Sequence, residues 1–222
     1  SAECARIVPR RKFSSPITLT AFSSIKFVNL IPFGELILIE APLKVVNLAK
    51  QQNIPIRIGV NAGSLEKELK EKDIPLADKM VESAMKHIQI LEDLDFDLIK
   101  VSLKSSDVLT TIEAYRLMAQ KVEYPLHLGV TEAGTLKNGL IKSSVGLGTL
   151  LAEGIGDTIR VSLTENPIEE VYAGFEILKS LKLRQKGVNF VSCPTCGRTQ
   201  IDLIGLAKKV EDRFKNLDAN NT

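Results

Sequence analysis

The feature that most constrains this chain is a regular alternation of strand-like and helix-like segments. Runs rich in β-branched and other apolar residues recur about every 30 to 40 residues from residue 46 onward, and each is followed by a helical pattern. Because parallel strands must be joined by a long crossover, usually a helix, this alternation predicts an α/β fold with parallel strands. The predicted strands are residues 56–61, 98–103, 126–131, 158–163 and 188–192.

The segments between these strands carry signals for helix boundaries. Apolar residues at helical spacing predict a helix over about residues 78–94, and Gly154 suits a helix end. Two pairs have the spacing of a capping box and predict helix starts, and the second is reinforced by a proline at the first helical position. The pairs are Thr110 with Glu113 and Asn166 with Glu169.

Alternate positions along each predicted strand differ in polarity. One set is apolar in all five strands, whereas the opposite set carries polar and charged groups toward the carboxyl ends. In a TIM (β/α)₈ barrel one face of each strand packs on the outer helices and the other faces the lumen, and active sites lie at the carboxyl ends. We therefore predict a TIM barrel with a functional lumen. Only five clear strands are present where a closed barrel needs eight, so the predicted barrel is incomplete.

The polar set has an excess of positive charge. Arg57, Lys100, Lys104 and Arg160 are cations, whereas Glu132 is the one carboxylate at a strand end. Such an excess is costly to bury unless an anion compensates it, and guanidinium and ammonium groups match phosphate oxygens. A diphosphate is thus a natural ligand. Neutral hydrogen-bonding groups accompany the cations at Asn61, Ser102, Thr131 and Ser162, and we interpret His127, taken alone, as a satisfied polar group of the core.

A second candidate site is the pair Cys193 and Cys196. A Cys-x-x-Cys pair can bind a metal ion, hold one edge of an iron–sulfur cluster or form a dithiol. A zinc ribbon needs a second pair, and the third cysteine, Cys4, has no partner motif beside it. The pair is therefore half of a metal site or a redox dithiol. Three cysteines without an even framework indicate a reducing compartment, for which we take the cytoplasm.

Charge and hydropathy exclude two classes of partner. With 29 basic and 27 acidic residues, the formal net charge of +2 gives no reason to expect nucleic acid as a ligand. The most apolar stretch, residues 27–43, is interrupted by proline, glycine and glutamate, so we expect no membrane span. Residues 1–45 are irregular, and the first 34 are basic and serine-rich like a transit peptide. We interpret this segment as a disordered or foreign end.

Five segments, residues 56–64, 99–104, 126–134, 154–164 and 189–198, closely resemble the bacterial 4-hydroxy-3-methylbut-2-enyl diphosphate synthase family. The resemblance covers about residues 46–216. It implies a TIM barrel followed by a small cluster-binding domain, and an iron–sulfur oxidoreductase acting on CH or CH2 groups. The implied reaction is the reductive ring opening of 2-C-methyl-D-erythritol 2,4-cyclodiphosphate in the non-mevalonate pathway of isoprenoid (terpenoid) biosynthesis.

The same resemblance implies a site, a cofactor and partners. A [4Fe-4S] cluster would be held by three cysteines and a glutamate, of which Cys193 and Cys196 would be two. Electrons would come from reduced flavodoxin or ferredoxin, and the full-length enzyme would be a homodimer. Glu132 is the candidate proton donor. The implied substrate-binding residues are Arg57, Asn61, Lys104, Thr131, Arg160 and Ser162.

The chain also departs from the family pattern. The family's third cysteine and its ligating glutamate lie in a domain beyond the barrel, which we expect to be absent here, so we expect impaired activity. We divide the chain into residues 1–45, which do not match the family, and a partial barrel over residues 46–222. Two alternatives stay open. One is a phosphate-binding lyase of TIM-barrel type with Lys100 or Lys104 as a Schiff-base amine. The other is a non-catalytic remnant with a zinc-binding or redox cysteine pair.

Overall fold

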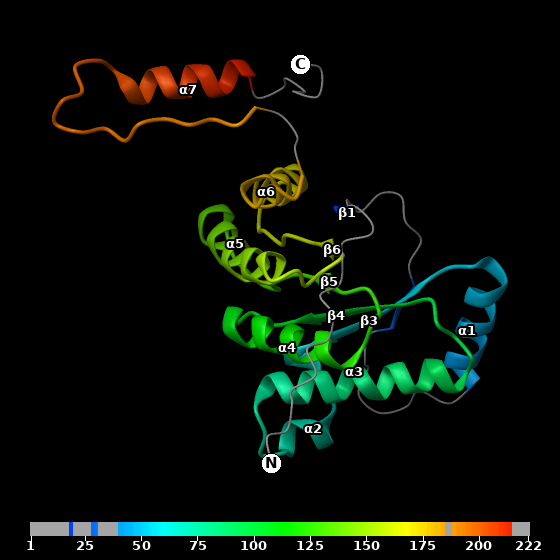
Figure 1. The fold of residues 1–222 in the computed structure, drawn as a ribbon. Helices are drawn as coiled ribbons and strands as arrows, with labels where there is room; N and C mark the ends of the chain where they lie inside the picture. The colour runs from blue at the N-terminus through cyan, green and yellow to red at the C-terminus, as the bar shows by residue number, and fades with distance from the viewer. Residues whose placement is uncertain (1–17, 20–27, 31–39, 185–187, 215–222) are drawn as a thin grey trace, which may run out of the picture.

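A computed structural model describes residues 18–19, 28–30, 40–184 and 188–214, and the side chains from residue 43 onward within these ranges (Figure 1). The strands are β1 (Thr18–Leu19), β2 (Val28–Leu30), β3 (Ile56–Asn61), β4 (Ile99–Lys104), β5 (His127–Leu128) and β6 (Thr158–Ile159). The helices are α1 (Glu40–Gln52), α2 (Lys67–Glu71), α3 (Leu76–Asp93), α4 (Val108–Lys121), α5 (Leu136–Ala152), α6 (Pro167–Ser180) and α7 (Leu203–Phe214). A 3₁₀ turn, Ala62–Ser64, follows β3. Most of the segment 1–45, including Cys4, lies outside the described residues.

All strand pairs are parallel, which confirms the predicted fold class. β2, β3 and β4 form one sheet, and β1, β6 and β5 form another. A single parallel bridge between Val101 and Leu126 joins them, and the Val101 amide donates to Pro125 O at 2.9 Å. The strands therefore lie in space in the order β2, β3, β4, β5, β6, β1, and each connection from β2 to β6 passes through a helix, as in a barrel wall.

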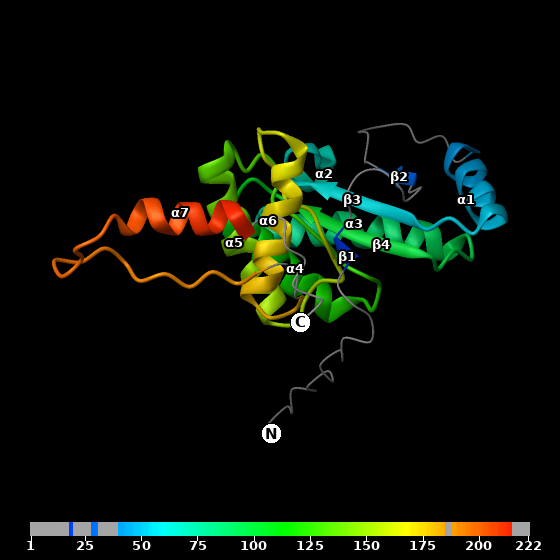
Figure 2. The same ribbon diagram turned by 90° about the horizontal axis from the view of Figure 1, so that it is seen from above.

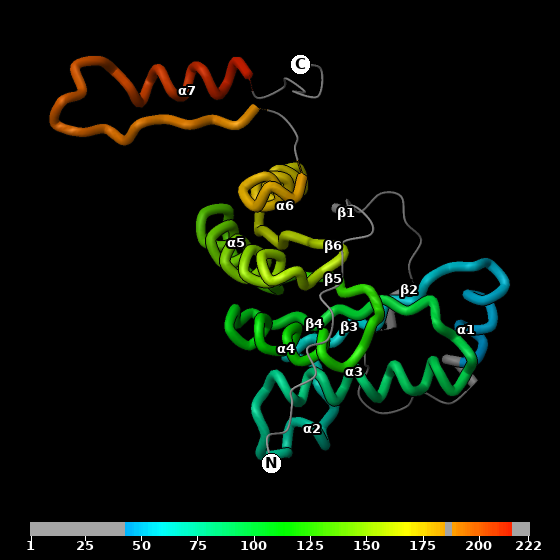
Figure 3. The backbone as a smooth tube through the Cα atoms, in the orientation of Figure 1, coloured from blue at the N-terminus to red at the C-terminus, as the bar shows by residue number. Residues whose placement is uncertain are grey.

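The alternation read from the sequence matches the observed burial on β3, whereas on the other strands Ser102, His127 and Thr158 of the polar set are also buried. Ile56, Ile58 and Val60 are almost completely buried, whereas the residues between them on β3 are half-buried. The helix α3 packs against β3 and β4, and α4 packs against β4. The backbone trace shows that α3, α4, α5 and α6 succeed one another along the strands (Figure 3), as their mutual contacts confirm. The main core thus lies between the apolar strand faces and this helical layer.

Three of the four helix predictions are confirmed. The helix predicted over about residues 78–94 is α3 (Leu76–Asp93). The Asn166 side chain accepts from the Ile168 amide at 3.0 Å at the start of α6, and Gly154, with φ 78°, follows the end of α5. The start predicted at Thr110 is wrong. The carboxylate of Asp107 accepts from the Thr110 amide at 2.7 Å, so α4 begins two residues earlier than Thr110. The ionised carboxylate of Asp107 lies beside the first free amides of the helix and binds them in preference to the hydroxyl of Thr110, which lies about one turn later.

The strand predictions hold to different extents. β3 and β4 run as predicted to within one residue, but β5 and β6 have two-residue ladders although Leu126, Leu128 and Val130 are all buried. The prediction of a strand at residues 188–192 is wrong. These residues are irregular, and Val191 is 90% exposed. A strand needs a neighbour to satisfy its backbone, and no described segment pairs with this one.

Residues 188–214, which we call the C-terminal arm, consist of this irregular segment and α7. None of the residues of α7, all of which the structure describes, is buried. Figure 1 and the view from above in Figure 2 both show the arm extending away from the strands and the helical layer. Among the described helices, none combines the length and the apolar character that crossing a bilayer requires.

Candidate anion-binding site

Four cationic side chains on neighbouring strands form what we call the cation cluster, Arg57, Lys100, Lys104 and Arg160. Arg57 lies opposite Lys100 in the register of β3 and β4, and Lys104 ends β4. Arg160 directly follows β6, where its amide donates to Leu128 O at 2.9 Å. All four side chains are half-buried, so solvent screens their mutual repulsion only in part.

The pKa shifts within the cluster show that its members share one environment. Burial, and next the charges of Arg57 and Arg160, lower the pKa of Lys104 to about 7. Burial and the Arg160 guanidinium also lower the pKa of Arg57. The pKa of Lys100 is lowered by burial and by Arg57, against an opposing effect of Asp157. The charged forms of Arg57, Lys100 and Lys104 are thus each destabilised by neighbouring cations, and an anion placed among them would reverse that effect.

Gly129, directly after β5, leaves room for the Lys104 side chain. A Cβ atom at Gly129 would lie 3.1 Å from Lys104 Cε and 3.2 Å from Arg160 O. A side chain at this position would require the end of Lys104 or the Arg160 backbone to shift by a few tenths of an ångström. Sequence reasoning treated this glycine only as a member of the polar set, and its neighbours along the chain do not indicate this contact.

Tyr115, on α4, is a residue that sequence reasoning missed. Its buried hydroxyl accepts from the Leu103 amide at 3.0 Å and donates to His127 O. The phenol therefore ties β4 to β5 directly beneath the polar face, where the ladder between the two strands is only a single bridge. Burial raises its pKa, which keeps the hydroxyl protonated as a donor. The one available signal was an aromatic residue with a polar tip among small apolar residues on one helix face.

His127 is only half satisfied, contrary to the interpretation from the sequence. It is 3% exposed, and its Nδ1 lies 2.8 Å from Thr158 Oγ1 across the β5 and β6 pair. Its Nε2 is buried and has no hydrogen-bond partner within the described part of the chain, and the same is true of Arg57 Nε. Burial, and then the charges of the cation cluster, lower the pKa of His127 to about 2, so the ring is neutral at physiological pH.

The neutral residues proposed for the site lie at the strand ends but differ in their roles. Asn61 lies opposite Lys104, and its side-chain oxygen accepts from the Gly63 amide at 3.2 Å, which commits it to the turn after β3. The Thr131 amide donates to Ser105 O at 3.2 Å. Ser102 is buried within β4, and Ser162 is half-buried two residues after Arg160.

Glu132 occupies a distinctive backbone position. It is exposed and has φ 51°, a left-handed conformation that is uncommon for a residue with a side chain. Such a conformation turns the chain sharply where the β5 segment leaves the sheet. Its role as a proton donor stays a prediction.

The cysteine pair lies in the C-terminal arm, apart from the cation cluster. Both thiols are exposed and free of disulfides within the described residues. The Cys196 amide donates to Thr199 Oγ1 at 3.1 Å, and backbone and hydroxyl donors at Arg198 and Thr199 lower the pKa of the Cys196 thiol. No group of three His, Cys, Asp or Glu residues in the described ranges could hold a metal ion. Since an iron–sulfur cluster needs three or four ligands, the described residues alone do not fit one.

Comparison with known proteins matches most of the chain to one family. Residues 8–175 match the GcpE TIM-barrel domain, a range that includes the cation cluster and ends before the cysteine pair. The match begins at residue 8, inside the segment that we expected not to match the family.

Curated relatives share more than half of their aligned residues with the chain. A protein from Geobacter sulfurreducens is 63% identical over 180 residues, 81% of this chain and 51% of its own length. A protein from Clostridium perfringens is 61% identical over 177 residues, 79% of this chain and 51% of its own length. Both are named 4-hydroxy-3-methylbut-2-en-1-yl diphosphate synthase (flavodoxin). The chain spans about half the length of the curated relatives it matches.

Proposed function

The chain belongs to the GcpE family, and we propose from this premise that its cation cluster binds the substrate of a 4-hydroxy-3-methylbut-2-en-1-yl diphosphate synthase. The proposed substrate is 2-C-methyl-D-erythritol 2,4-cyclodiphosphate, and the proposed reaction is its reductive ring opening in isoprenoid biosynthesis. Support comes from the names of relatives at 55–63% identity. Because the chain spans half their length, the whole activity is a proposal for the complete enzyme.

The observation that carries the proposal is the gathering of four half-buried cations, Arg57, Lys100, Lys104 and Arg160, on β3 and β4 and directly after β6. A lysine whose pKa is near 7 beside two guanidinium groups regains its charge when an anion arrives. In this proposal Arg57 and Arg160 each offer a planar fork to diphosphate oxygens, whereas Lys104 offers a point charge. Asn61, Thr131 and Ser162 add neutral hydrogen bonds at the strand ends, and Glu132 serves as the proton donor.

The cofactor part of the proposal rests on the family. Cys193 and Cys196 would be two ligands of a [4Fe-4S] cluster, whose remaining ligands would come from residues beyond those described. Such a cluster, when bound, supplies the electrons for the reduction. The relatives' names give flavodoxin as the electron donor, and we propose flavodoxin or a ferredoxin here. A homodimer and a cytoplasmic location stay predictions.

The proposal also includes the architecture. β2 and β1 are the two ends of the observed strand order, so further strands between them would close an eight-stranded barrel. We propose that the described strands are part of such a barrel and that a separate cluster-binding domain belongs to the complete enzyme. The names of the relatives do not favour the alternatives of a Schiff-base lyase and a non-catalytic remnant.

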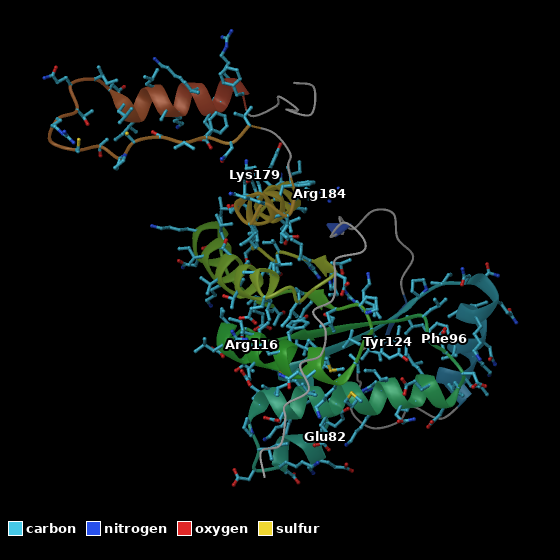
Figure 4. The ribbon with its side chains drawn as sticks, viewed as in Figure 1. Glu82, Phe96, Arg116, Tyr124, Lys179 and Arg184 are labelled. Atoms are coloured by element: carbon cyan, nitrogen blue, oxygen red, sulfur yellow. The ribbon has the colours of Figure 1, made fainter. Side chains whose placement is uncertain are left out.

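Calorimetry with the cyclic diphosphate tests the binding step on this chain. Replacing Arg57 or Arg160 by alanine should weaken binding by about 2 kcal/mol or more each, because a charged hydrogen bond in a half-buried site is lost. A lysine at either position should restore only part of it. The control is Arg116→Ala, which removes an arginine that pairs with Glu153 on the outer helices (Figure 4). Equal affinity of both alanine variants and the wild-type protein, with folding confirmed by circular dichroism, would show that these arginines do not bind the ligand.

A further inference from the structure

One ring nitrogen of His127 is an unused hydrogen-bonding group in the most charged part of the molecule. The ring is 3% exposed, and Nε2 has no hydrogen-bond partner within the described residues. Buried polar atoms of native proteins are nearly always paired, so a group without a partner indicates a ligand or a function. We propose that His127 is a ligand-binding residue whose Nε2–H donates to an oxygen of the bound diphosphate, while Thr158 holds the ring through Nδ1.

The position of the ring supports this proposal. His127 and Gly129 are alternate residues of the β5 segment, so their side-chain positions lie on the same face of the sheet. A Cβ atom at Gly129 would lie 3.5 Å from Lys104 Nζ, which places that ammonium over the face from which the imidazole projects. All four members of the cation cluster act electrostatically on the ring. An anion that binds the cluster through Lys104 therefore lies within the surroundings of His127.

A neutral ring is sufficient for this role, and without an anion the surroundings keep the ring neutral. Burial and the four cations lower the pKa of His127 to about 2. A neutral imidazole carries one N–H group, and either nitrogen can hold it. The Thr158 hydroxyl is both a donor and an acceptor, so it satisfies Nδ1 in both tautomers.

The two tautomers suit different states of the site. Without an anion, the positive potential of the cation cluster favours a lone pair on Nε2 and the hydrogen on Nδ1, which donates to Thr158 Oγ1. Diphosphate oxygens accept hydrogen bonds, so the bound state needs the hydrogen on Nε2. The Thr158 hydroxyl then rotates and donates to Nδ1. The exchange is balanced, because Nδ1 loses a proton to water and Nε2 takes one from water.

This inference rests on the proposed function, since it requires an anion in the cation cluster. To the guanidinium and ammonium groups of the cation cluster His127 would add a neutral donor whose direction is fixed by Thr158. A neutral donor adds one directed hydrogen bond rather than a charge, so we expect His127 to orient the diphosphate and to strengthen its binding modestly, while the cations supply most of the attraction.

Nitrogen-15 NMR of the histidines gives a direct test, because the chain has only two of them. His87 Nδ1 lies 2.8 Å from Ser83 O on α3, which fixes its tautomer and makes it an internal reference. Histidine-labelled protein is titrated with inorganic pyrophosphate, and long-range proton–nitrogen spectra assign the protonated nitrogen of each ring. We expect the hydrogen of His127 to move from Nδ1 to Nε2 on binding, whereas the His87 signals stay unchanged.

Two conservative variants test the energetic role. His127→Gln can place an amide donor near the position of Nε2, whereas His127→Asn places its amide near Nδ1 and does not reach the ligand. We expect the asparagine variant to bind pyrophosphate about tenfold more weakly than the glutamine variant, as for the loss of one hydrogen bond.

The outcomes separate this inference from the proposed function. If calorimetry shows that pyrophosphate binds the wild-type protein while the His127 nitrogens are unchanged and the two variants bind equally, the inference is wrong and the anion site stands. Absence of pyrophosphate binding to the wild-type chain would overturn the anion site and this inference with it. The spectra of the wild-type protein decide the tautomer even if a variant fails to fold.

Discussion

The strands and the C-terminal arm have similar apolar patterns, but the apolar side chains of the strands are buried and those of the arm are exposed. Leu128 on β5 is 0% exposed, whereas Leu206 on α7 is 49% exposed and Ile204 is 71% exposed. In Figure 4 the side chains of the first region fill the space between strands and helices, whereas those of the arm project around a single ribbon. Burial therefore depends on the neighbours of a segment and not on its own pattern.

Among the described residues, a hydrogen bond joins α6 to the C-terminal arm, and a cation–π contact lies beside it within the helical layer. Lys179 Nζ, on α6, donates to Val188 O at 3.2 Å, and the Arg184 guanidinium lies 5.5 Å from the centre of the Phe175 ring. Figure 4 shows Lys179 and Arg184 together at α6. Contacts of this kind contribute little compared with apolar burial, so the folding of the strand region should not depend on the arm.

The largest expected difference comes from removing the same side chain in each region. Leu128→Ala should lower the free energy of unfolding by about 2–5 kcal/mol, because it leaves a cavity in a packed core. Leu206→Ala should change it by less than about 0.5 kcal/mol. Urea denaturation followed by circular dichroism measures both. Comparable losses in the two variants would mean that the arm packs against the rest of the protein in solution.

Replacing one lysine in each region compares how a half-buried and an exposed ammonium group affect the pH dependence of stability. The pKa of Lys104 is lowered from 10.5 to about 7 in the folded protein, so between these values the unfolded state binds the extra proton. Stability should therefore rise with pH across this window, by on the order of 2 kcal/mol between pH 7 and pH 9. Lys104→Met should remove that rise. Lys209→Met, in the exposed α7, should keep it. Denaturation at several pH values tests this, and the same slope in all three proteins would contradict it.

One glycine in each region allows the same comparison, because an added Cβ atom meets packed neighbours in one region and open space in the other. Gly156 has φ 113°, and a Cβ atom there would lie 2.5 Å from Leu128 Cδ1, so Gly156→Ala should destabilise the protein by about 1 kcal/mol or more. Gly197, in the arm, has nothing within 4 Å of the same added atom, and Gly197→Ala should be close to neutral. Thermal unfolding of both variants measures the difference. A destabilising Gly197→Ala would reveal a packed arm.

The smallest expected effect concerns thiol reactivity within the arm. Backbone donation at Arg198 and the Thr199 hydroxyl lower the pKa of Cys196, which raises its thiolate fraction near neutral pH. In a Cys4→Ser background, Thr199→Val should slow the alkylation of Cys196 by iodoacetamide a few-fold at pH 7. Mass spectrometry of the peptides gives the rate, with Cys193 as the reference within the same chain. An unchanged rate would show that the hydroxyl does not support the thiolate.

The sequence by itself determined the features that are local or periodic. The α/β class followed from the spacing of strands, and the start of α6 followed from Asn166, because a cap acts on amides within one turn. Alternation along the strands grouped Arg57, Lys104 and Arg160 on one face, and the lowered pKa values of Arg57 and Lys104, each caused in part by Arg160, agree with a shared location. A two-residue period fixes the face of a strand without reference to any partner.

Only the tertiary structure decided which polar groups have partners and which apolar groups are covered. The sequence could not show that Tyr115 bridges β4 and β5, or that His127 keeps one nitrogen unpaired within the described residues, because both depend on the register between strands. Residues 188–192 have the composition of a strand, yet they are exposed because no described strand lies beside them. Hydrogen bonding and burial are properties of pairs of segments, and a single segment cannot specify its neighbour.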